Sequence, residues 1–304
     1  MSSLWRTTLV LLILSTIIYA MNGTLEYILL KHFSLYSFFF LWSLGGVLSV
    51  PLLMRMMGMR NDLFRNVRRH ILSITGGVLL VVFNLALFMA FKLYFLAGVY
   101  PLIAVSSLMF FAIDLARYRS RLRSTAVVLT MAGIILVVVG TFFAESIGFS
   151  FNYFMLPFAL VIILFAGLGY YLVFYNIHKY SIGSKISAIA LASFVSSIFL
   201  LFAAPQAETM QLAQPFYSVV AVISGMLYVA AVAIELKAVK INENIKLYKS
   251  VILKNFINNF TYLDTVLVLL FSVAIGSFVP VEVLGGLLIV FGIVIIAMAK
   301  GKGR

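Results

Sequence analysis

The sequence predicts an all-α polytopic membrane protein with ten transmembrane helices, arranged as two inverted five-helix repeats. Three observations predict this fold: an apolar composition, ten long apolar runs, and basic residues that alternate with those runs. Of the 304 residues, 64% are hydrophobic and 10% are charged, whereas a soluble domain is roughly 45–50% apolar and about 25% charged. The mean hydropathy is +1.15. This composition excludes a soluble globular protein and a disordered chain.

Ten runs of the sequence are long enough to cross the hydrocarbon core, which takes about 20 mostly apolar residues. They cover residues 4–30, 35–54, 71–96, 99–116, 126–144, 154–177, 186–204, 216–238, 251–275 and 281–299. The first run lacks a small-residue cleavage site, so we interpret it as a span and not as a cleaved signal peptide. The connections between runs are short, and none is polar enough to form a separate soluble domain.

The basic residues set the predicted topology, because lysine and arginine concentrate in cytoplasmic loops. With both termini in the cytoplasm, ten alternating spans place every Lys and Arg at the cytoplasmic side except Lys31 and Lys92. The net charge of +13 then reflects membrane topology, and no basic surface for nucleic acid is expected. We expect an integral protein of the cell membrane, surrounded by the lipid bilayer. A monomer is compatible with the sequence, which carries no signal for an oligomeric state.

Short similarities recur about half a chain apart. Residues 31–37 resemble 178–184, the pair Gly133 and Gly140 matches Gly285 and Gly292, and Phe91-Lys92 matches Leu236-Lys237. The predicted halves are 1–146 and 147–304, with five spans each. Because five is odd, the second half enters the membrane from the opposite side. Such inverted repeats are common in secondary transporters, whose sites lie near the midplane between the halves.

Several motifs fit this arrangement. The first helix could be broken at residues 20–24. The third and eighth runs both end in apolar residues followed by lysine, at 89–92 and 234–237. The fourth run has Pro101 near its start, and the last run has a Gly-x₆-Gly pattern at 285–294. In these features the chain resembles the drug/metabolite transporter (DMT) superfamily, in its ten-helix EamA-like branch. It departs from that family at Arg123-Ser124 and Gly276-Ser277, where a Gly-Glu-Arg turn is usual. The resemblance implies a transporter of small organic solutes, with spans one, three, four, six, eight and nine around a central cavity.

Two carboxyl groups lie deepest in the apolar runs, Glu26 in span one and Asp264 in span nine. Ionisable groups in spans are costly and therefore mark candidate functional sites. Both are candidates for proton coupling and substrate binding, because a carboxylic acid in apolar surroundings can exchange a proton near neutral pH. The alternative for Glu26 is a charge near the outer mouth, paired with Lys92.

Polar residues in the spans give further candidates for substrate binding. Span nine holds Asn255, Asn258, Asn259, Tyr262 and Asp264. The first four of these lie at i, i+3, i+4 and i+7, which is one helix face. This face either lines a substrate cavity or fastens the helix through interhelical hydrogen bonds. Isolated candidates in other spans are Asn22, Asn84, Tyr171, Asn176 and Tyr228. Asn22 belongs with Gly23 and Glu26 to a segment that could locally open the first helix, whereas each of the other four alone is more simply a packing residue.

The sequence contains no cysteine and shows neither a Walker loop nor a His-Glu-x-x-His motif. We therefore expect no cofactor, no metal and no enzymatic activity. The function that fits best is a secondary transporter of amino acids, metabolites or amphipathic drugs, working by alternating access. The alternatives are an organophosphate or nucleotide-sugar exchanger, which needs Lys or Arg in its cavity, and a membrane enzyme acting on lipid-linked substrates. Glycines such as Gly45-Gly46, Gly76-Gly77 and Gly169 are expected to allow close helix packing.

Overall fold

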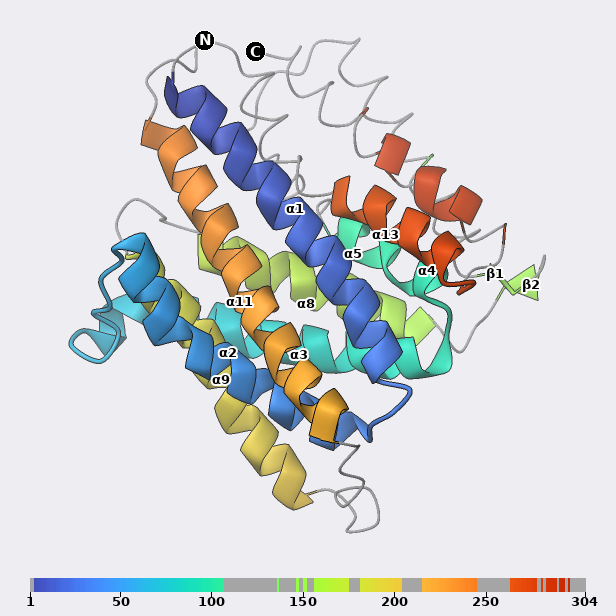
Figure 1. Ribbon diagram of the computed structural model, residues 1–304, viewed down its shortest axis with the longest axis horizontal. Coiled ribbons are helices and arrows are strands. Elements are labelled where there is room, and N and C mark those ends of the chain that lie inside the picture. Colours follow the sequence, from blue (N-terminus) through green and yellow to red (C-terminus); the bar gives the residue numbers. More distant parts are fainter. Residues whose placement is uncertain are drawn as a thin grey trace.

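The computed structural model describes residues 3–106, 136, 146–147, 150–151, 156–174, 181–203, 215–244, 263–277, 280, 283–288, 290–292 and 295. These residues are mainly helical (Figure 1). Six helices are long and apolar enough to cross a membrane; they are α1 (Ser3–Leu29), α2 (Leu35–Met57), α3 (Ile71–Leu93), α8 (Leu156–Phe174), α9 (Ile182–Ala203) and α11 (Pro215–Asn244). They match the first, second, third, sixth, seventh and eighth predicted runs. The protein therefore has the helical, membrane-spanning character that its sequence predicts.

The other four predicted runs are described only in part. The short helix α4 (Leu96–Val99) precedes the fourth run and overlaps it only at Val99, and α5 (Pro101–Val105) lies within that run. Helix α13 (Leu263–Ala274) covers the second part of run 251–275, and a short apolar helix at Val283–Gly292 lies in the last run. Run 126–144 lies outside the described residues except for residue 136. The count of ten helices and the inverted repeat stay predictions.

A break divides the start of the fourth run, where the sequence predicts a continuous helix. Helix α4 ends at Val99, and α5 begins at Pro101. Proline has no backbone N–H to donate and its ring crowds the preceding turn, so the helical hydrogen-bond ladder is interrupted here. The break leaves Tyr100 between the two helices with its side chain buried.

One departure from an all-α fold lies between the two predicted halves. Strands β1 (Ser146–Ile147) and β2 (Ser150–Phe151) pair antiparallel, with Ser146 opposite Phe151. With two residues in each strand, this pair is too short to form a sheet of its own. It adds no sheet layer to the helical bundle.

Helices α2 and α9 begin with the same serine cap. In α2 the hydroxyl of Ser34 accepts a hydrogen bond from the backbone N–H of Ser37 at 3.2 Å, and in α9 Ser181 accepts from the N–H of Ser184 at 3.2 Å. A serine in this place satisfies one of the N–H groups left free at a helix start. The two caps lie in the segments 31–37 and 178–184, which the sequence aligned with each other.

Close approach of helix backbones confirms the packing role expected for the glycines. A Cβ added to Gly45 of α2 would overlap the carbonyl of Val222, and one on Gly225 of α11 would overlap the carbonyl of Trp42. Gly76 of α3 and Gly169 of α8 face each other's helices in the same manner. Small residues allow helix backbones to approach this closely. In a bilayer the hydrophobic effect does not drive helices together, so the dispersion contacts made at close approach hold them together.

The main helix contacts join the two predicted halves. Helix α1 packs along α11, α3 along α8, and α2 against both α9 and α11, as Figure 1 shows for α1 and α11. Residues later in the first segment contact residues earlier in α11. Tyr19 of α1 bonds to Glu235, whereas His32, just after α1, stacks on Tyr217. The two helices are therefore antiparallel.

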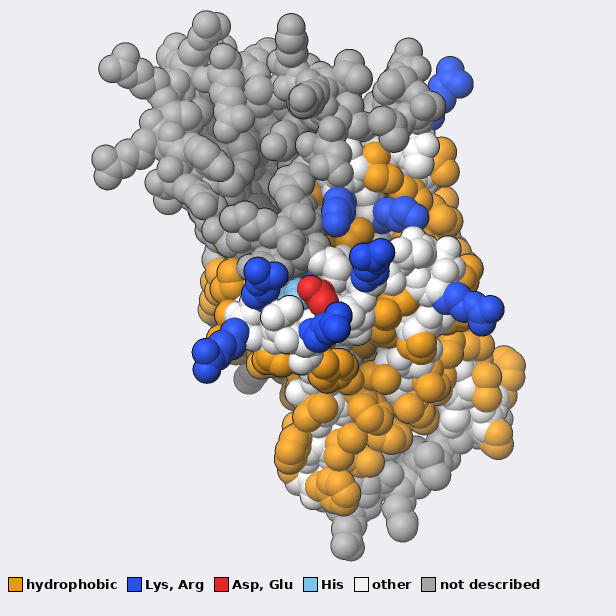
Figure 2. Space-filling view, turned by 90° about the vertical axis from the view of Figure 1, so that its left-hand side faces the viewer, with side chains coloured by type: hydrophobic (Ala, Val, Ile, Leu, Met, Phe, Trp, Pro, Cys, Tyr) orange, Lys and Arg blue, Asp and Glu red, His pale blue; other side chains and the backbone are white. Residues whose placement is uncertain are grey.

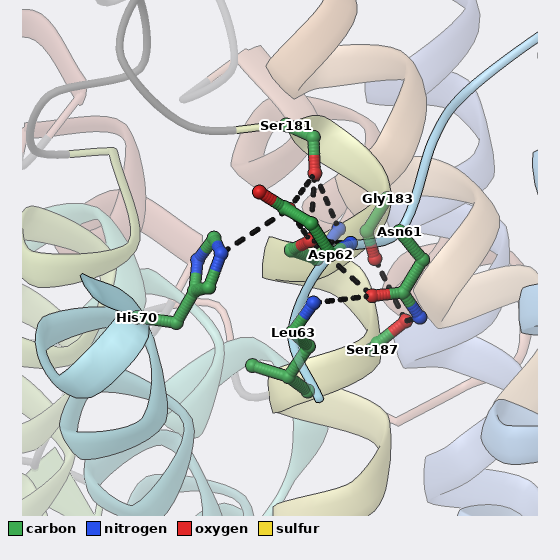
Figure 3. A network of polar contacts seen from close by, with 8 residues as sticks. Asn61, Asp62, Leu63, His70, Ser181, Gly183 and Ser187 are labelled. Atoms are coloured by element: carbon green, nitrogen blue, oxygen red, sulfur yellow. Dashed lines mark hydrogen bonds and ion pairs between the residues drawn. The ribbon is translucent and has the colours of Figure 1, made fainter. Parts of the chain in front are cut away.

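A polar network also joins the halves, between the segment after α2 and the start of α9 (Figure 3). Asp62 accepts hydrogen bonds from the hydroxyls of Ser181 and Ser184, and its backbone N–H donates to Ser184 at 2.8 Å. His70 lies 3.2 Å from the same carboxylate. The hydrogen bond from Ser184, together with Ser181 and His70, holds the pKa of Asp62 below its ordinary value.

From the sequence, Lys185 is expected in a cytoplasmic connection before the seventh run, but the structure places it within a helix. It lies in the first turn of α9, fully buried. Its amino group donates to the carbonyl oxygen of Val173, in the last turn of α8. A cation beside the C-terminal carbonyls of a helix is favoured by the helix dipole, so Lys185 fastens the end of α8 to the start of α9.

Candidate functional site

Glu26 is the most deeply buried acid of α1, with 4% of its side chain exposed. Its Oε1 accepts two hydrogen bonds, from Asn22 Nδ2 at 2.6 Å and from the indole Nε1 of Trp42 at 2.8 Å. Asn22 lies one helical turn earlier, so it shares the helix face of Glu26. Among the described residues, no Lys, Arg or His forms an ion pair with this carboxyl group. In the described part of the chain, Glu26 is therefore held by neutral donors.

Asn22 also connects α1 to the second half of the chain. Its Oδ1 accepts a hydrogen bond from the hydroxyl of Ser224 on α11 at 2.8 Å, and both side chains are buried. The amide thus bonds through both its polar atoms, to Glu26 on one side and to Ser224 on the other. This bond joins a residue of the first predicted half to one of the second.

Asp264, in the first turn of α13, is the second buried acid. Its Oδ2 lies 3.2 Å from the hydroxyl of Tyr100, which donates to it, and its Oδ1 accepts from the hydroxyl of Thr265 at 3.3 Å. A carboxyl group at this end of a helix is favoured by the helix dipole. The proline break before α5 places Tyr100 here, and the Tyr100 ring lies against Gly23 of α1, where a Cβ would overlap it.

Tyrosine side chains fill the space between these acids and α11. Tyr19 donates to Oε2 of Glu235 at 3.0 Å, and the hydroxyls of Tyr170 and Tyr228 lie 3.5 Å apart. The ring of Tyr228 lies 6.4 Å from that of Tyr19 and 4.8 Å from that of Trp42. These contacts join the environments of Glu26 and Glu235 into one region.

Asn84 of α3 lies beside the Tyr228 hydroxyl, with 2% of its side chain exposed. Its Nδ2 is buried and makes no hydrogen bond of good geometry to the described residues. A buried amide donor left unpaired costs free energy. The amide of Asn84 is therefore a polar group that faces the Tyr228 hydroxyl inside the helix bundle.

We name these residues the central polar cluster. Its members are Tyr19, Asn22, Glu26, Trp42, Asn84, Tyr100, Tyr170, Ser224, Tyr228, Glu235 and Asp264. They come from α1, α2, α3, the α4–α5 break, α8, α11 and α13. The charged members are all acids. Among the described residues, no group of three His, Asp or Glu is placed to hold a metal ion.

Five of the residues predicted from the sequence meet in this cluster: Asn22, Glu26, Asn84, Tyr228 and Asp264. Tyr171 is half-buried, and it is the neighbouring Tyr170 whose hydroxyl reaches Tyr228. Asn176, Asn255, Asn258, Asn259 and Tyr262 lie outside the described residues. The suggested pairing of Glu26 with Lys92 is wrong, because Lys92 donates instead to the carbonyl oxygen of Phe33 at 2.9 Å.

The sequence reasoning missed six members of the cluster, and a helical period could have found three of them. Tyr19 precedes Asn22 and Glu26 at i, i+3 and i+7, which is one helix face. Ser224, Tyr228 and Glu235 follow a similar period along α11. The remaining three are Trp42, Tyr100 and Tyr170, which carry no such signal in their apolar runs.

Comparison with known proteins gives a fold likeness alone. No family model and no curated protein matches this chain. Solved structures do match, nine chains in all. One of them, described as "Crystal structure of protein", aligns with 98% of this chain and 96% of its own, at a TM-score of 0.50 and 16% sequence identity. At that identity the likeness concerns the arrangement of helices and not the function.

Proposed function

We propose that the protein is a secondary transporter of small organic solutes, which bind at the central polar cluster and reach it alternately from the two sides of the membrane. The observation that carries the proposal is the bond between Asn22 and Ser224, beside the buried carboxyl group of Glu26. Polar and acidic side chains deep among membrane-spanning helices are costly and are typical of solute or ion pathways. Here they lie where the two halves of the chain meet.

The pairing of helices supports two inverted repeats. If spans one to five correspond to spans six to ten, the contact of α1 with α11 corresponds to that of α8 with α3. Both contacts occur, and both are among the most extensive helix contacts of the chain. The serine caps of α2 and α9 add a local correspondence. This supports a membership of the ten-helix EamA-like branch, which we propose on the sequence motifs and this pairing.

Protons are the coupling ion that fits the cluster best. Glu26 and Asp264 are both buried and have only neutral hydrogen-bond donors among the described residues. A buried carboxylate without a cation is unfavourable, so each group gains by binding either a proton or a positively charged solute. Exchange of one for the other would couple solute movement to a proton gradient.

The cluster favours a solute with a cationic or hydrogen-bond-donating group and an apolar body. Its charges are acidic, and aromatic rings such as Trp42 and Tyr228 can contact a cation or an apolar group. The organophosphate exchanger considered from the sequence is less supported, because phosphate needs Lys or Arg. Among the described lysines, Lys92 binds the Phe33 carbonyl and Lys237 is not among the cluster contacts.

The transport experiment starts from a probe found by ligand stabilisation. Amino acids, polyamines and aromatic amines are screened for a rise in the melting temperature of the purified protein, because a bound solute stabilises it by mass action. Uptake of the best ligand is then measured in proteoliposomes, with and without a pH gradient. Glu26→Gln and Asp264→Asn are expected to abolish the response to the gradient. Asp62→Asn, which removes a carboxyl group outside the cluster, is the control; because it also lowers stability at pH 7, uptake by each variant is compared as the ratio with and without the gradient.

If neither cluster variant changes the pH response, proton coupling through these groups is wrong.

The orientation of the chain in the membrane is tested separately. The absence of native cysteine allows single cysteines to be labelled from one side of intact cells. We propose that both termini are cytoplasmic, in the cell membrane, so positions in 58–66 should be labelled only after the membrane is permeabilised.

A further inference from the structure

The segment that connects α2 to α3 is held in a fixed conformation on its inner side. Leu63 and His70 are buried, and Asn61 donates to the Ser187 hydroxyl at 2.8 Å. Asp62 is tied to the first turn of α9. The segment ends in the 3₁₀ helix η1 (Val67–His70), which leads directly into α3. Its outward side is therefore presented in one orientation.

That outward side combines positive charge with exposed apolar side chains. The basic residues are all exposed; they are Arg55, Arg60, Arg65, Arg68 and Arg69. None of them forms an ion pair with another described residue. Phe64 is 76% exposed and Val67 52% exposed between them. Figure 2 shows this face, with basic side chains gathered around a small acidic area.

The acidic area does not cancel the positive charge. Asp62 is the one acid between Arg55 and His70, and its carboxylate already accepts from two serine hydroxyls and lies beside His70. Binding the carboxylate inward leaves five guanidinium groups without an acidic partner from this segment. An anionic partner from outside can satisfy them.

The position of the segment identifies that partner. It lies between the end of α2 and the start of α3, two helices long enough to cross the membrane. Whichever way the chain is oriented, a segment at the ends of two spanning helices lies at the level of the lipid headgroups. Guanidinium groups bind phosphate in a bidentate manner, and an aromatic ring such as Phe64 is favoured at the boundary of water and acyl chains. A soluble acidic partner would leave Phe64 and Val67 without a function.

We propose that residues 55–70 form a docking surface for the phosphate headgroups of anionic lipids, with Phe64 inserted among the headgroups. The surface is separate from the central polar cluster and does not depend on the proposed transport function. Juxtamembrane clusters of arginine attract anionic lipids with an energy that adds up over the residues.

The experiment counts bound lipid by native mass spectrometry of the full-length protein in detergent. Dioleoyl phosphatidylglycerol and dioleoyl phosphatidylcholine are added in equal amounts to three forms of the protein. Wild type is expected to retain phosphatidylglycerol preferentially. The variant Arg65→Gln/Arg68→Gln/Arg69→Gln should lose this preference, with a fall in affinity of about tenfold or more. The control Arg6→Gln/Lys237→Gln/Lys240→Gln removes the same charge elsewhere and should keep it.

A second measurement tests the insertion of Phe64 without removing charge. Phe64→Cys is labelled with a polarity-sensitive fluorophore, and the protein is placed in nanodiscs with or without phosphatidylglycerol. Emission should shift to shorter wavelength when the anionic lipid is present. The proposal is overturned if both triple variants lose lipid equally, if wild type does not discriminate between the two lipids, or if the fluorophore stays in water in both nanodiscs.

Discussion

The indole Nε1–H of Trp42 donates to the carboxyl Oε1 of Glu26 at 2.8 Å, and both side chains are buried. The bond joins α1 to α2 at the edge of the central polar cluster. The indole ring of Trp42 also packs against the aromatic rings of Phe88 and Tyr228. Trp42 therefore orients the one carboxyl group that α1 places deep in the protein.

Trp42→Phe should destabilise the protein by about 1–3 kcal/mol, because it leaves a buried acceptor with one donor fewer. The remaining ring keeps most of the packing. Thermal unfolding in detergent measures the effect. Phe39→Leu is the control, since Phe39 stacks on Trp42 without bonding Glu26. If the Trp42 variant impaired pH-dependent transport no more than the Phe39 variant, the indole would have no part in orienting the acid.

A double-mutant cycle measures the bond between Tyr100 and Asp264. The two side chains are in contact, so Tyr100→Phe and Asp264→Asn should be non-additive by about 0.5–3 kcal/mol in unfolding free energy. Tyr100→Phe combined with Asp62→Asn should be additive, because Asp62 lies in a different network. Additivity of the first pair would mean that Tyr100 does not hold Asp264.

Gly225→Ala should destabilise the α2–α11 contact by about 1–3 kcal/mol, the usual cost of overpacking. The new methyl group would overlap the backbone carbonyl of Trp42, which cannot move away as a side chain can. Val219→Ala on the same helix is the control, because Val219 is 59% exposed. Unfolding in detergent compares the two variants. An alanine at 225 that leaves stability unchanged would contradict this close approach.

Asp62→Asn should destabilise the protein at pH 7, with an effect that disappears in acid. The pKa of Asp62 is held below its ordinary value of 3.8, first by the hydrogen bond from Ser184. A lowered pKa means that the charged form stabilises the folded state. This stabilisation is complete above the unfolded pKa and is lost as the pH falls through the folded pKa.

The melting temperatures of wild type and Asp62→Asn should therefore differ at pH 7 and approach each other as the pH falls below 3.8. Ser181→Ala removes one donor to the same carboxylate and should reduce the difference in part. A gap between wild type and the Asp62 variant that widens in acid would show that the carboxylate does not stabilise the contact with α9.

The parts of the fold that could be predicted from the sequence are those set by local pattern. The length of an apolar run predicted α1, α2 and α3. Burial of Glu26 followed from its place inside a span. Each of these depends on residues close together in the chain, and so the sequence carries the signal directly.

Contacts between distant residues could not be predicted in this way. The bond from Ser224 to Asn22 depends on how α11 packs on α1, and the glycines indicate close packing without naming the partner. Trp42 looks like any apolar residue of a span until α2 is placed beside α1. Lys185 was assigned to a connection by its charge, but α9 begins before it and the carbonyl of Val173 gives it a buried partner.

The most direct test of the account is the accessibility of Ser224 from the two sides of the membrane. Ser224→Cys is labelled with a membrane-impermeant thiol reagent in right-side-out and inside-out vesicles, with Ser43→Cys, packed against Ser197, as the control. The account predicts that position 224 reacts from both sides, that a stabilising solute protects it, and that position 43 does not react. Reaction from neither side, or from one side only with no effect of solute, would contradict a transport pathway through the central polar cluster.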